Sequence, residues 1–355
     1  MSKRFPFSPF PSGWYVVVPS AELAAGALQA RTFMGKEIVV WRTASGVACV
    51  SDAYCPHLGA HFGHGGNVDG ECLRCPFHDF RFDTAGTCVS TSYGHAPPAA
   101  ARLHTWPVHE RNGFVLAWFD EAGRAPWFEV PAVDEGEGWS PLRVGSWTFP
   151  GHPQETTENS VDLGHFVAVH RYSDIEIIKD LQTEGPYLTS RYAMRRSADV
   201  FGSAGKSFRA EFEIHVWGLG WSFVDVKVPE IDMHSHHYVL PTPIDGDRIE
   251  LRVALSVASL ASPRKVAPPL ALLPRALSHW IVTELTWRGY QHDVAQDLAI
   301  WSNKAYLHPP ALAKGDGPVG RYRAWARQFY PAGGAAAEPA VEPTVERAEP
   351  EGAPA

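Results

Sequence analysis

The sequence predicts an α+β protein of two domains, a small all-β domain followed by a larger domain with an antiparallel sheet and C-terminal helices. The chain has 355 residues, of which 45% are hydrophobic and 20% charged, and this is enough for two packed cores. Residues 14–119 are short β-rich runs broken by turn residues. The later residues combine strand-like alternation with a long stretch of helical spacing, so we expect sheet and helices in one domain.

The N-terminal all-β domain is predicted over residues 13–120. Its last two runs, WPVHER and FVLAWF, are joined by Asn112 and Gly113. Both residue types tolerate positive φ, so this junction predicts a tight hairpin. Earlier runs with the same character are WYVVV, KEIVVWR and GVACVSD.

The second domain is predicted over residues 143–331, after an exposed connection, 121–142, rich in Pro, Gly and acidic residues. The runs RAEFEIHVW and DRIELRVALSV alternate with period two, as strands do. Helical spacing begins near Leu272, and Pro274 is expected in the first helical turn. Residues 332–355 contain mostly Ala, Glu and Pro, so we expect a disordered tail.

Composition excludes several classes of function. The net charge of -8 is spread along the chain, which argues against a nucleic-acid binder. No uncharged apolar stretch reaches the length of a membrane span, and the first residues lack a secretory signal, so we expect a cytoplasmic protein. Five cysteines, all in the first quarter of the chain, favour metal ligation over disulfides.

A first metal centre is predicted from two mixed pairs, Cys55 with His57 and Cys75 with His78, separated by seventeen residues. Two thiolates on one iron and two imidazoles on the other describe a Rieske [2Fe–2S] centre. Zinc is the alternative, because the same residues could form a tetrahedral site and Cys72 makes a C-x-x-C with Cys75. Zinc is less favoured because zinc fingers usually pair such knuckles with helical histidines. The remaining residues, expected as buried thiols and loop histidines, are Cys49, Cys72, Cys88, His61 and His64.

The segments CPHLGAHFGHGG and CPFHDFRFD resemble the Rieske domain of ring-hydroxylating and related oxygenases. The resemblance implies that Cys55, His57, Cys75 and His78 hold a [2Fe–2S] cluster. Many relatives carry Gly-Trp where this chain has Asp79-Phe80, a difference that keeps an aromatic side chain.

A second metal centre is suggested by TTENSVDLGHFVAVHRY, in which His165 and His170 are five residues apart and Thr and Asn could cap a helix. Non-haem iron that activates dioxygen uses two histidines and one carboxylate, but such a pair alone is a weak signal. ENSVDLGHFVAVH resembles the N-x-x-D-x-x-H-x-x-x-x-H segment of the same oxygenases. The resemblance implies His165 and His170 as iron ligands and Asn159 and Asp162 as catalytic residues.

The third ligand is expected in HDVAQDLAIWSNKAY, where Asp293 and Asp297 lie four residues apart on one helical face. Either aspartate could face the iron by spacing alone. QDLAIWSNK resembles the family segment that contains the ligand, which implies Asp297 and leaves Asp293 as a solvated charge. The surrounding PTPID resembles family sequence that lines the substrate side, which implies local hydrogen bonding there rather than metal ligation for a competing cluster, Asp232, His234 and His236.

The resemblance covers the chain from Gly13 to Tyr330 and implies a helix-grip-like catalytic domain and a head-to-tail homotrimer. In the trimer Asp162 would join a Rieske histidine, His78, of one subunit to His165 of the next, since a carboxylate can accept both ring N–H groups. No Gly-rich dinucleotide fingerprint follows a strand, so NAD(P)H would act through a separate ferredoxin or flavin reductase. A non-catalytic Rieske electron carrier is the alternative.

The motifs above, with RYRAWARQFYP, most resemble the steroid branch: 3-ketosteroid 9α-hydroxylase oxygenases, cholesterol 7-desaturases and bacterial sterol C4 demethylases. The resemblance implies that dioxygen is used to hydroxylate, desaturate or demethylate a sterol or steroid, and an aromatic or other small-molecule hydroxylase is the alternative. A predicted helix over residues 266–285 could wall a long apolar pocket, pack in the core or make a shallow membrane contact.

Overall fold

The N-terminal domain is all-β, as predicted. The computed structural model describes residues 5–197 and 207–331, and the expected tail at 332–355 lies outside them. Arg111 pairs with Phe114 across Asn112 and Gly113, which have φ of 55° and 79°, so the predicted hairpin is confirmed. The domain contains three small antiparallel sheets: β1 (Gly13–Pro19), β10 (Phe114–Phe119) and β9 (Val108–Arg111); β2 (Leu28–Phe33), β3 (Lys36–Arg42) and β4 (Ala48–Asp52); and β5 (Asn67–Asp69), β6 (Cys72–Arg74), β7 (Arg81–Phe82) and β8 (Cys88–Ser90), with a 3-10 turn η1 (Ser20–Glu22) after β1.

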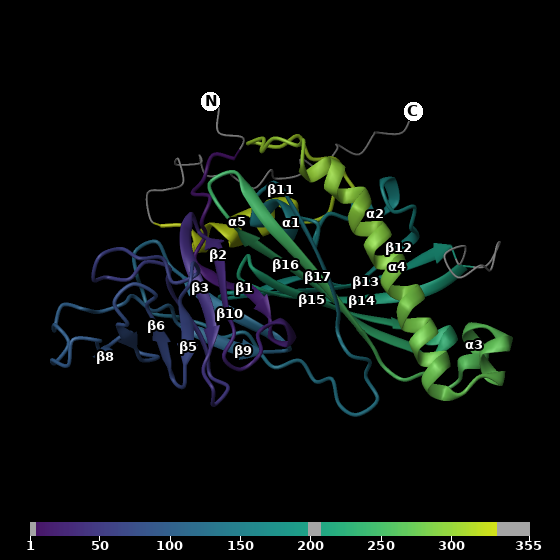
Figure 1. The fold of residues 1–355 in the computed structure, drawn as a ribbon. Helices are drawn as coiled ribbons and strands as arrows, with labels where there is room; N and C mark the ends of the chain where they lie inside the picture. The colour runs from purple at the N-terminus through teal and green to yellow at the C-terminus, as the bar shows by residue number, and fades with distance from the viewer. Residues whose placement is uncertain (1–4, 198–206, 332–355) are drawn as a thin grey trace, which may run out of the picture.

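The second domain is built on one seven-stranded antiparallel sheet (Figure 1). Its strands follow chain order except that the first pairs with the last, which gives the order β11-β17-β16-β15-β14-β13-β12. The strand bounds are β11 (Arg143–Pro150), β12 (Ser173–Glu184), β13 (Tyr187–Ser197), β14 (Ser207–Trp217), β15 (Trp221–Val228), β16 (Met233–Pro243) and β17 (Arg248–Val257). The helices are α1 (Pro153–Glu158), α2 (Leu163–Ala168), α3 (Pro263–Val266), α4 (Arg275–Trp301) and α5 (Val319–Ala326), and the 3-10 turns are η3 (Pro229–Ile231), η4 (Pro268–Leu272) and η5 (Arg327–Phe329).

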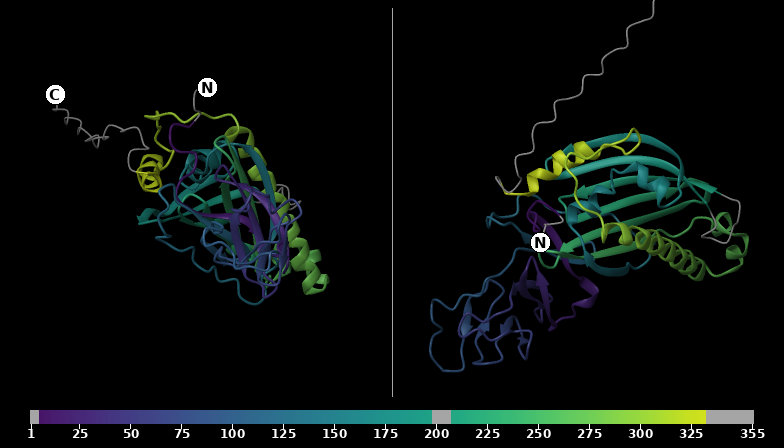
Figure 2. Two further views of the ribbon diagram at one scale, coloured as in Figure 1. Left: turned by 60° about the vertical axis from the view of Figure 1, so that its left-hand side comes forward. Right: turned by 90° about the horizontal axis from the view of Figure 1, so that it is seen from above.

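The two faces of the large sheet have different neighbours. On β16, Tyr238 and Leu240 pack against Trp14 and Phe114 of the N-terminal domain. The alternate residues His237 and Val239 face a cavity on the side that α4 covers. The N-terminal domain packs against one end of the sheet (Figure 2), so its position is fixed by a shared apolar core.

The connection between the domains, 121–142, contains neither helix nor strand, and only Trp139 forms an isolated bridge, with Ala258. It is nevertheless anchored: Val130 is fully buried, and Glu135 accepts hydrogen bonds from Tyr238 and Ser256. The expectation of an exposed connection is therefore wrong at these residues.

The predicted helix over residues 266–285 is interrupted. Proline lacks a backbone N–H and crowds the preceding turn, and Pro268, Pro269 and Pro274 divide the region into α3, η4 and α4. Pro274 itself is the N-cap of α4 rather than a first-turn residue. In the described part of the chain, no helix combines the length and apolarity needed to cross a bilayer.

Candidate metal centres

The two Cys–His pairs lie on two loops of the N-terminal domain that are closed in the same way. The backbone N–H of Cys55 donates to the carbonyl of Ala60, and the N–H of Cys75 donates to the carbonyl of Phe80, both at 2.8 Å. Both cysteines are buried, and the rings of the paired histidines, His57 and His78, lie 4.8 Å apart at 74°. The fold thus brings all four predicted residues to one place.

These four side chains fit a bound metal cluster. The Nδ1 atoms of His57 and His78 are buried and have no hydrogen-bond partner in the described chain. A buried nitrogen without a partner is costly, and ligation through Nδ1 would satisfy both. Burial, together with the neighbouring Cys75, raises the pKa of the Cys55 thiol and so favours its protonated form. A bound metal would instead favour the thiolate, because the thiolate is the form that ligates metals.

Phe80 orients the first cluster histidine. The His57 ring stacks on Phe80 at 4.3 Å with an interplanar angle of 6°. Phe80 is fully buried and contacts the imidazole on one face. The other cysteines follow expectation in part: Cys49 and Cys88 are buried, whereas Cys72 is only partly buried.

The second candidate centre joins His165 of α2, His170 just beyond it, and Asp297 in the last turns of α4. One ligand atom from each lies within 4.8 Å of the others. His170 Nε2 is 3.4 Å from Asp297 Oδ2, and the two imidazoles lie 5.2 Å apart at 80°. The three residues chosen from the sequence therefore meet, although 127 positions separate His170 from Asp297 along the printed chain.

The spacing of five between the histidines works because α2 is short. A continuous helix would turn residues five apart to different directions, but α2 ends at Ala168, and the His170 N–H reaches the His165 carbonyl at 3.4 Å. Arg171, with φ of 59°, then redirects the chain into β12. Sequence reasoning expected Thr and Asn to cap this helix, but the N-cap is Asp162.

Each candidate histidine is oriented through its Nδ1 atom. His170 Nδ1 faces Gln296 Oε1 at 3.0 Å, and His165 Nδ1 faces the backbone carbonyl of Asp162. Both acceptors are oxygens, so both rings carry hydrogen on Nδ1 and leave Nε2 for a metal. Sequence reasoning missed Gln296, although it immediately precedes Asp297.

The electrostatics of the two histidines differ. Burial is the main cause that lowers the pKa of His165. Burial also opposes the charged form of His170, but its hydrogen bond to Asp297 and the charge of that carboxylate outweigh burial and raise the His170 pKa. The carboxylate thus attracts positive charge to this point, as a cation site requires.

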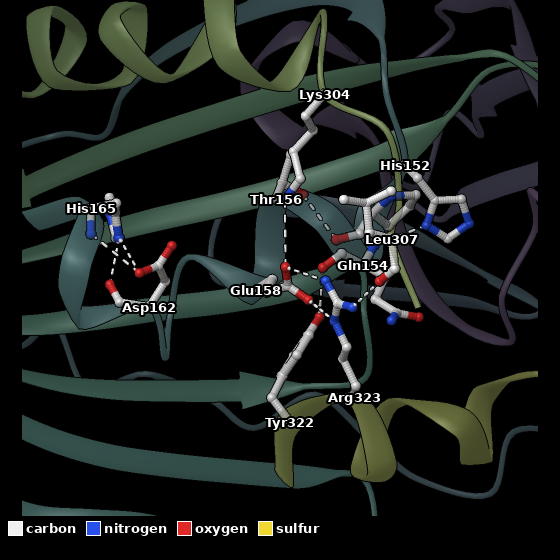
Figure 3. A network of polar contacts seen from close by, with 11 residues as sticks. His152, Gln154, Thr156, Glu158, Asp162, His165, Lys304, Leu307, Tyr322 and Arg323 are labelled. Carbon is white, nitrogen blue, oxygen red and sulfur yellow. Dashed lines mark hydrogen bonds and ion pairs between the residues drawn. The ribbon is translucent and has the colours of Figure 1, made fainter. Parts of the chain in front are cut away.

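The Asp162 carboxylate caps α2 (Figure 3). Its Oδ1 accepts from the His165 backbone N–H at 3.2 Å and is 3.9 Å from His165 Nδ1. Within one chain, therefore, the His165 ring bonds to the carbonyl of Asp162 rather than to its carboxylate. Asn159 is the C-cap of α1 and lines the cavity.

Helix α1 is anchored to α5 through Glu158, its last residue (Figure 3). The buried Glu158 carboxylate accepts two hydrogen bonds from Arg323 of α5, at 2.7 and 3.0 Å. Lys304 Nζ lies 3.4 Å from the same carboxylate. This network fixes the segment that carries Asn159 and Asp162.

Asp293 is not the solvated charge that the sequence suggested. It forms a double ion pair with Arg196 of β13, with both N–O distances at 2.8 Å. Arg196 also donates to the Tyr172 hydroxyl at 3.2 Å. Burial raises the pKa of Asp293, although the charge of Arg196 opposes this effect. The pair lines the same cavity as the three candidate ligands.

The cavity itself is mainly apolar. Strands β14 to β17 supply much of its wall, including Phe212, Ile214, Val226, Val239 and Val253. His237 also faces it, and burial lowers the His237 pKa to about 3, so this imidazole is neutral. One end is therefore able to bind a metal while most of the wall suits a hydrophobic molecule.

The competing cluster on β16 differs from its predicted form. Asp232 pairs with Lys265 at 2.7 Å, and the carboxylate beside His234 is instead Asp225, at 2.6 Å. One ligand atom each of Asp225, His234 and His236 also lies within 4.8 Å of the others. His234 and His236 point away from the cavity, because alternate residues of a strand face opposite sides, so their expected place on the substrate side is wrong.

Comparisons with known proteins agree with this division of the chain. Residues 13–107 match the Rieske [2Fe-2S] domain, and residues 117–330 match the 3-ketosteroid 9alpha-hydroxylase C-terminal domain. Cholesterol 7-desaturase from Bombyx mori is 29% identical over 347 residues, covering 93% of this chain and 71% of that protein. A probable 3-ketosteroid-9-alpha-monooxygenase oxygenase component from Rhodococcus rhodochrous is 30% identical over 334 residues, covering 90% and 79%.

Among solved structures, dicamba monooxygenase bound to dicamba aligns with a TM-score of 0.62 and 20% identity, covering 89% of this chain and 96% of that one. NdmA from Pseudomonas putida CBB5 aligns with a TM-score of 0.65 and 15% identity, covering 88% of each chain. These similarities establish the fold, and the α+β prediction is confirmed. The chain therefore belongs to the 3-ketosteroid 9α-hydroxylase family of Rieske non-haem iron oxygenases, which use a [2Fe–2S] cluster and a mononuclear iron.

Proposed function

We propose that this protein is the terminal oxygenase that hydroxylates, desaturates or oxidatively demethylates a sterol or steroid, with electrons from a ferredoxin or flavin reductase. The main support is that two histidines and an aspartate meet at the wall of an apolar cavity. The names of the Bombyx and Rhodococcus relatives point to sterols and steroids. An aromatic or other small-molecule substrate is the second candidate, because dicamba monooxygenase shares the fold.

In this proposal Cys55, His57, Cys75 and His78 hold the [2Fe–2S] cluster, and His165, His170 and Asp297 hold the iron. When bound, these groups supply electron transfer and the activation of dioxygen. The protein's own contribution is positioning: Gln296 and the Asp162 carbonyl orient the imidazoles, and the apolar wall excludes water from the substrate.

The polar groups of the cavity provide contacts for a substrate oxygen. The Arg196–Asp293 pair and the neutral His237 interrupt an otherwise apolar wall. A few convergent polar groups in an apolar pocket usually fix the orientation of a ligand. We propose that they set which carbon of the substrate approaches the iron.

We further propose a head-to-tail homotrimer in which Asp162 lies between subunits. The cluster loops, beside β5 and β6, and α2 lie on opposite sides of the molecule (Figure 1), so electron transfer within one subunit would be long. Next to the cluster histidines, Leu58 and Phe77 are 65% and 62% exposed, and Val167 of α2 is also exposed. Contact between these surfaces would bury apolar area and bring a neighbour's His78 toward Asp162.

Substrate-dependent dioxygen consumption with a surrogate reductase, screened over sterols, ketosteroids and simple aromatics, tests the proposal. Iron content separates an enzyme from an electron carrier: the cluster alone accounts for about two irons per chain, and the mononuclear site adds about one more. The proposed function is refuted if no Rieske-type EPR signal appears after reduction, or if activity survives replacement of His165 and His170 by alanine.

A further inference from the structure

The segment from α3 to the start of α4 exposes an unusual amount of apolar surface. Every residue from Ala271 to Leu277 is exposed, and Leu272 is 87% exposed. Leu273, which precedes α4, is also exposed, as are Leu277 and Trp280, which lie three residues apart on one side of α4. An expectation of core packing fails for these side chains. Clustered exposed apolar residues of this kind mark an interaction site.

The inner side of the same segment is part of the wall of the substrate cavity. Leu270 and Val282 are buried in one cluster with Ile231 and Met233. Ile231 and Met233 also line the cavity. The Ser278 hydroxyl donates to the carbonyl of Leu270 at 3.1 Å and ties η4 to α4. Only a thin layer of protein therefore separates the exposed leucines from the cavity.

The charged residues of this segment are all of one sign. The chain carries a net charge of -8, yet it has no Asp or Glu between Glu250 and Glu284. Within that stretch Arg264, Lys265 and Arg275 are exposed. Lys265 pairs with Asp232, and the two arginines remain as an excess of positive charge. Basic residues beside exposed leucines and a tryptophan complement anionic lipid headgroups over an apolar layer.

We propose that this surface, formed by Arg264, Lys265, Leu272, Leu273, Arg275, Leu277 and Trp280, docks on an anionic lipid bilayer. It lies at the end of the molecule far from the Rieske domain (Figure 1), so docking does not cover the cluster loops that the proposed trimer brings to the neighbouring subunit. A lipid substrate would then pass from the bilayer to the cavity across the α3–α4 layer without crossing water. This last step depends on the proposed function, whereas docking itself does not.

Vesicle sedimentation of the full, cofactor-loaded chain tests docking. Wild-type protein is expected to bind phosphatidylcholine vesicles that contain phosphatidylglycerol. Its binding should be weaker to vesicles of phosphatidylcholine alone, and weaker at high salt. Leu272→Asp/Leu277→Asp should reduce binding about tenfold or more, because two apolar side chains leave the bilayer interface. Position 277 is in the first turn of α4, where aspartate is favourable, so the helix should persist.

The matched control is Leu307→Asp/Leu312→Asp, which makes the same change at two exposed leucines outside the surface. It should bind vesicles as the wild type does. Arg264→Glu/Arg275→Glu should abolish the preference for anionic vesicles. Visible absorption of the cluster and circular dichroism verify that all variants are folded.

Three results would overturn the proposal. The first is that the wild type fails to bind vesicles, and the second is that Leu272→Asp/Leu277→Asp binds them as well as the wild type does. The third result is a change of oligomeric state in that variant while the wild type does not bind vesicles. The last result would assign the surface to protein contact. Vesicle binding requires neither substrate nor turnover, so failure of sterol oxidation would refute the proposed function and leave docking standing. If both hold, the double aspartate variant should raise KM for vesicle-borne sterol and leave kcat unchanged.

Discussion

Replacing Asp162 by asparagine separates the two roles of this residue. In the structure its carboxylate caps α2 through the His165 N–H at 3.2 Å, while its backbone carbonyl accepts from the His165 ring. Asparagine caps helices about as well as aspartate, so Asp162→Asn should change the free energy of unfolding by less than about 0.5 kcal/mol. The carbonyl is unaffected, so the iron content should stay the same.

The expected loss in Asp162→Asn is therefore confined to turnover. Removing a carboxylate that acts outside the ligand shell typically lowers activity about 10–100-fold, and an electron path through Asp162 would make the loss larger. Asp162→Ala is the control for the cap, with an expected cost of about 1 kcal/mol in unfolding free energy. Dioxygen consumption at saturating reductase, iron analysis and denaturant unfolding measure the three quantities. Full activity of Asp162→Asn would refute the bridging role, and loss of iron would show that Asp162 instead maintains the iron site.

Four further predictions follow from the contacts of the second domain. Asp297→Ala should lower iron content by about one per chain and preserve the Rieske EPR signal, and an unchanged iron content would exclude Asp297 as a ligand. Gln296→Leu should weaken iron binding about 10–100-fold by freeing the His170 ring, whereas the helix neighbour Gln291→Leu should not, as measured by chelator competition. Arg196→Met should cost about 3 kcal/mol by leaving Asp293 buried and unpaired, and Arg196→Met/Asp293→Leu should recover most of it in unfolding experiments; equal losses would contradict pairing. Burial lowers the His152 pKa from 6.5 to about 3, so between these pH values the unfolded chain binds a proton that the folded chain does not. The free energy of unfolding should therefore fall by up to about 1.4 kcal/mol for each pH unit below pH 6.5. His152→Gln should flatten this slope in pH-dependent denaturation.

The sequence by itself determined the local structures. The Asn112-Gly113 turn and the strands around it follow from short-range conformational preferences, and the Cys55–His57 and Cys75–His78 pairs lie on loops a few residues long. The site residues of α2 and Asp297 were found because their motifs resemble those of known oxygenases. Spacing alone left Asp293 and Asp297 equivalent.

Tertiary structure decided the contacts between distant segments. Gln296 orients His170 across 126 positions, and Arg196 neutralises Asp293 across 97. Neither contact has a local signature, because each depends on how α4 crosses the sheet. The exposure of Leu272 and the turning of His237 rather than His236 toward the cavity likewise depend on strand register and helix packing. A sequence records which side chains can perform the chemistry, whereas burial and direction arise only when the whole chain is packed.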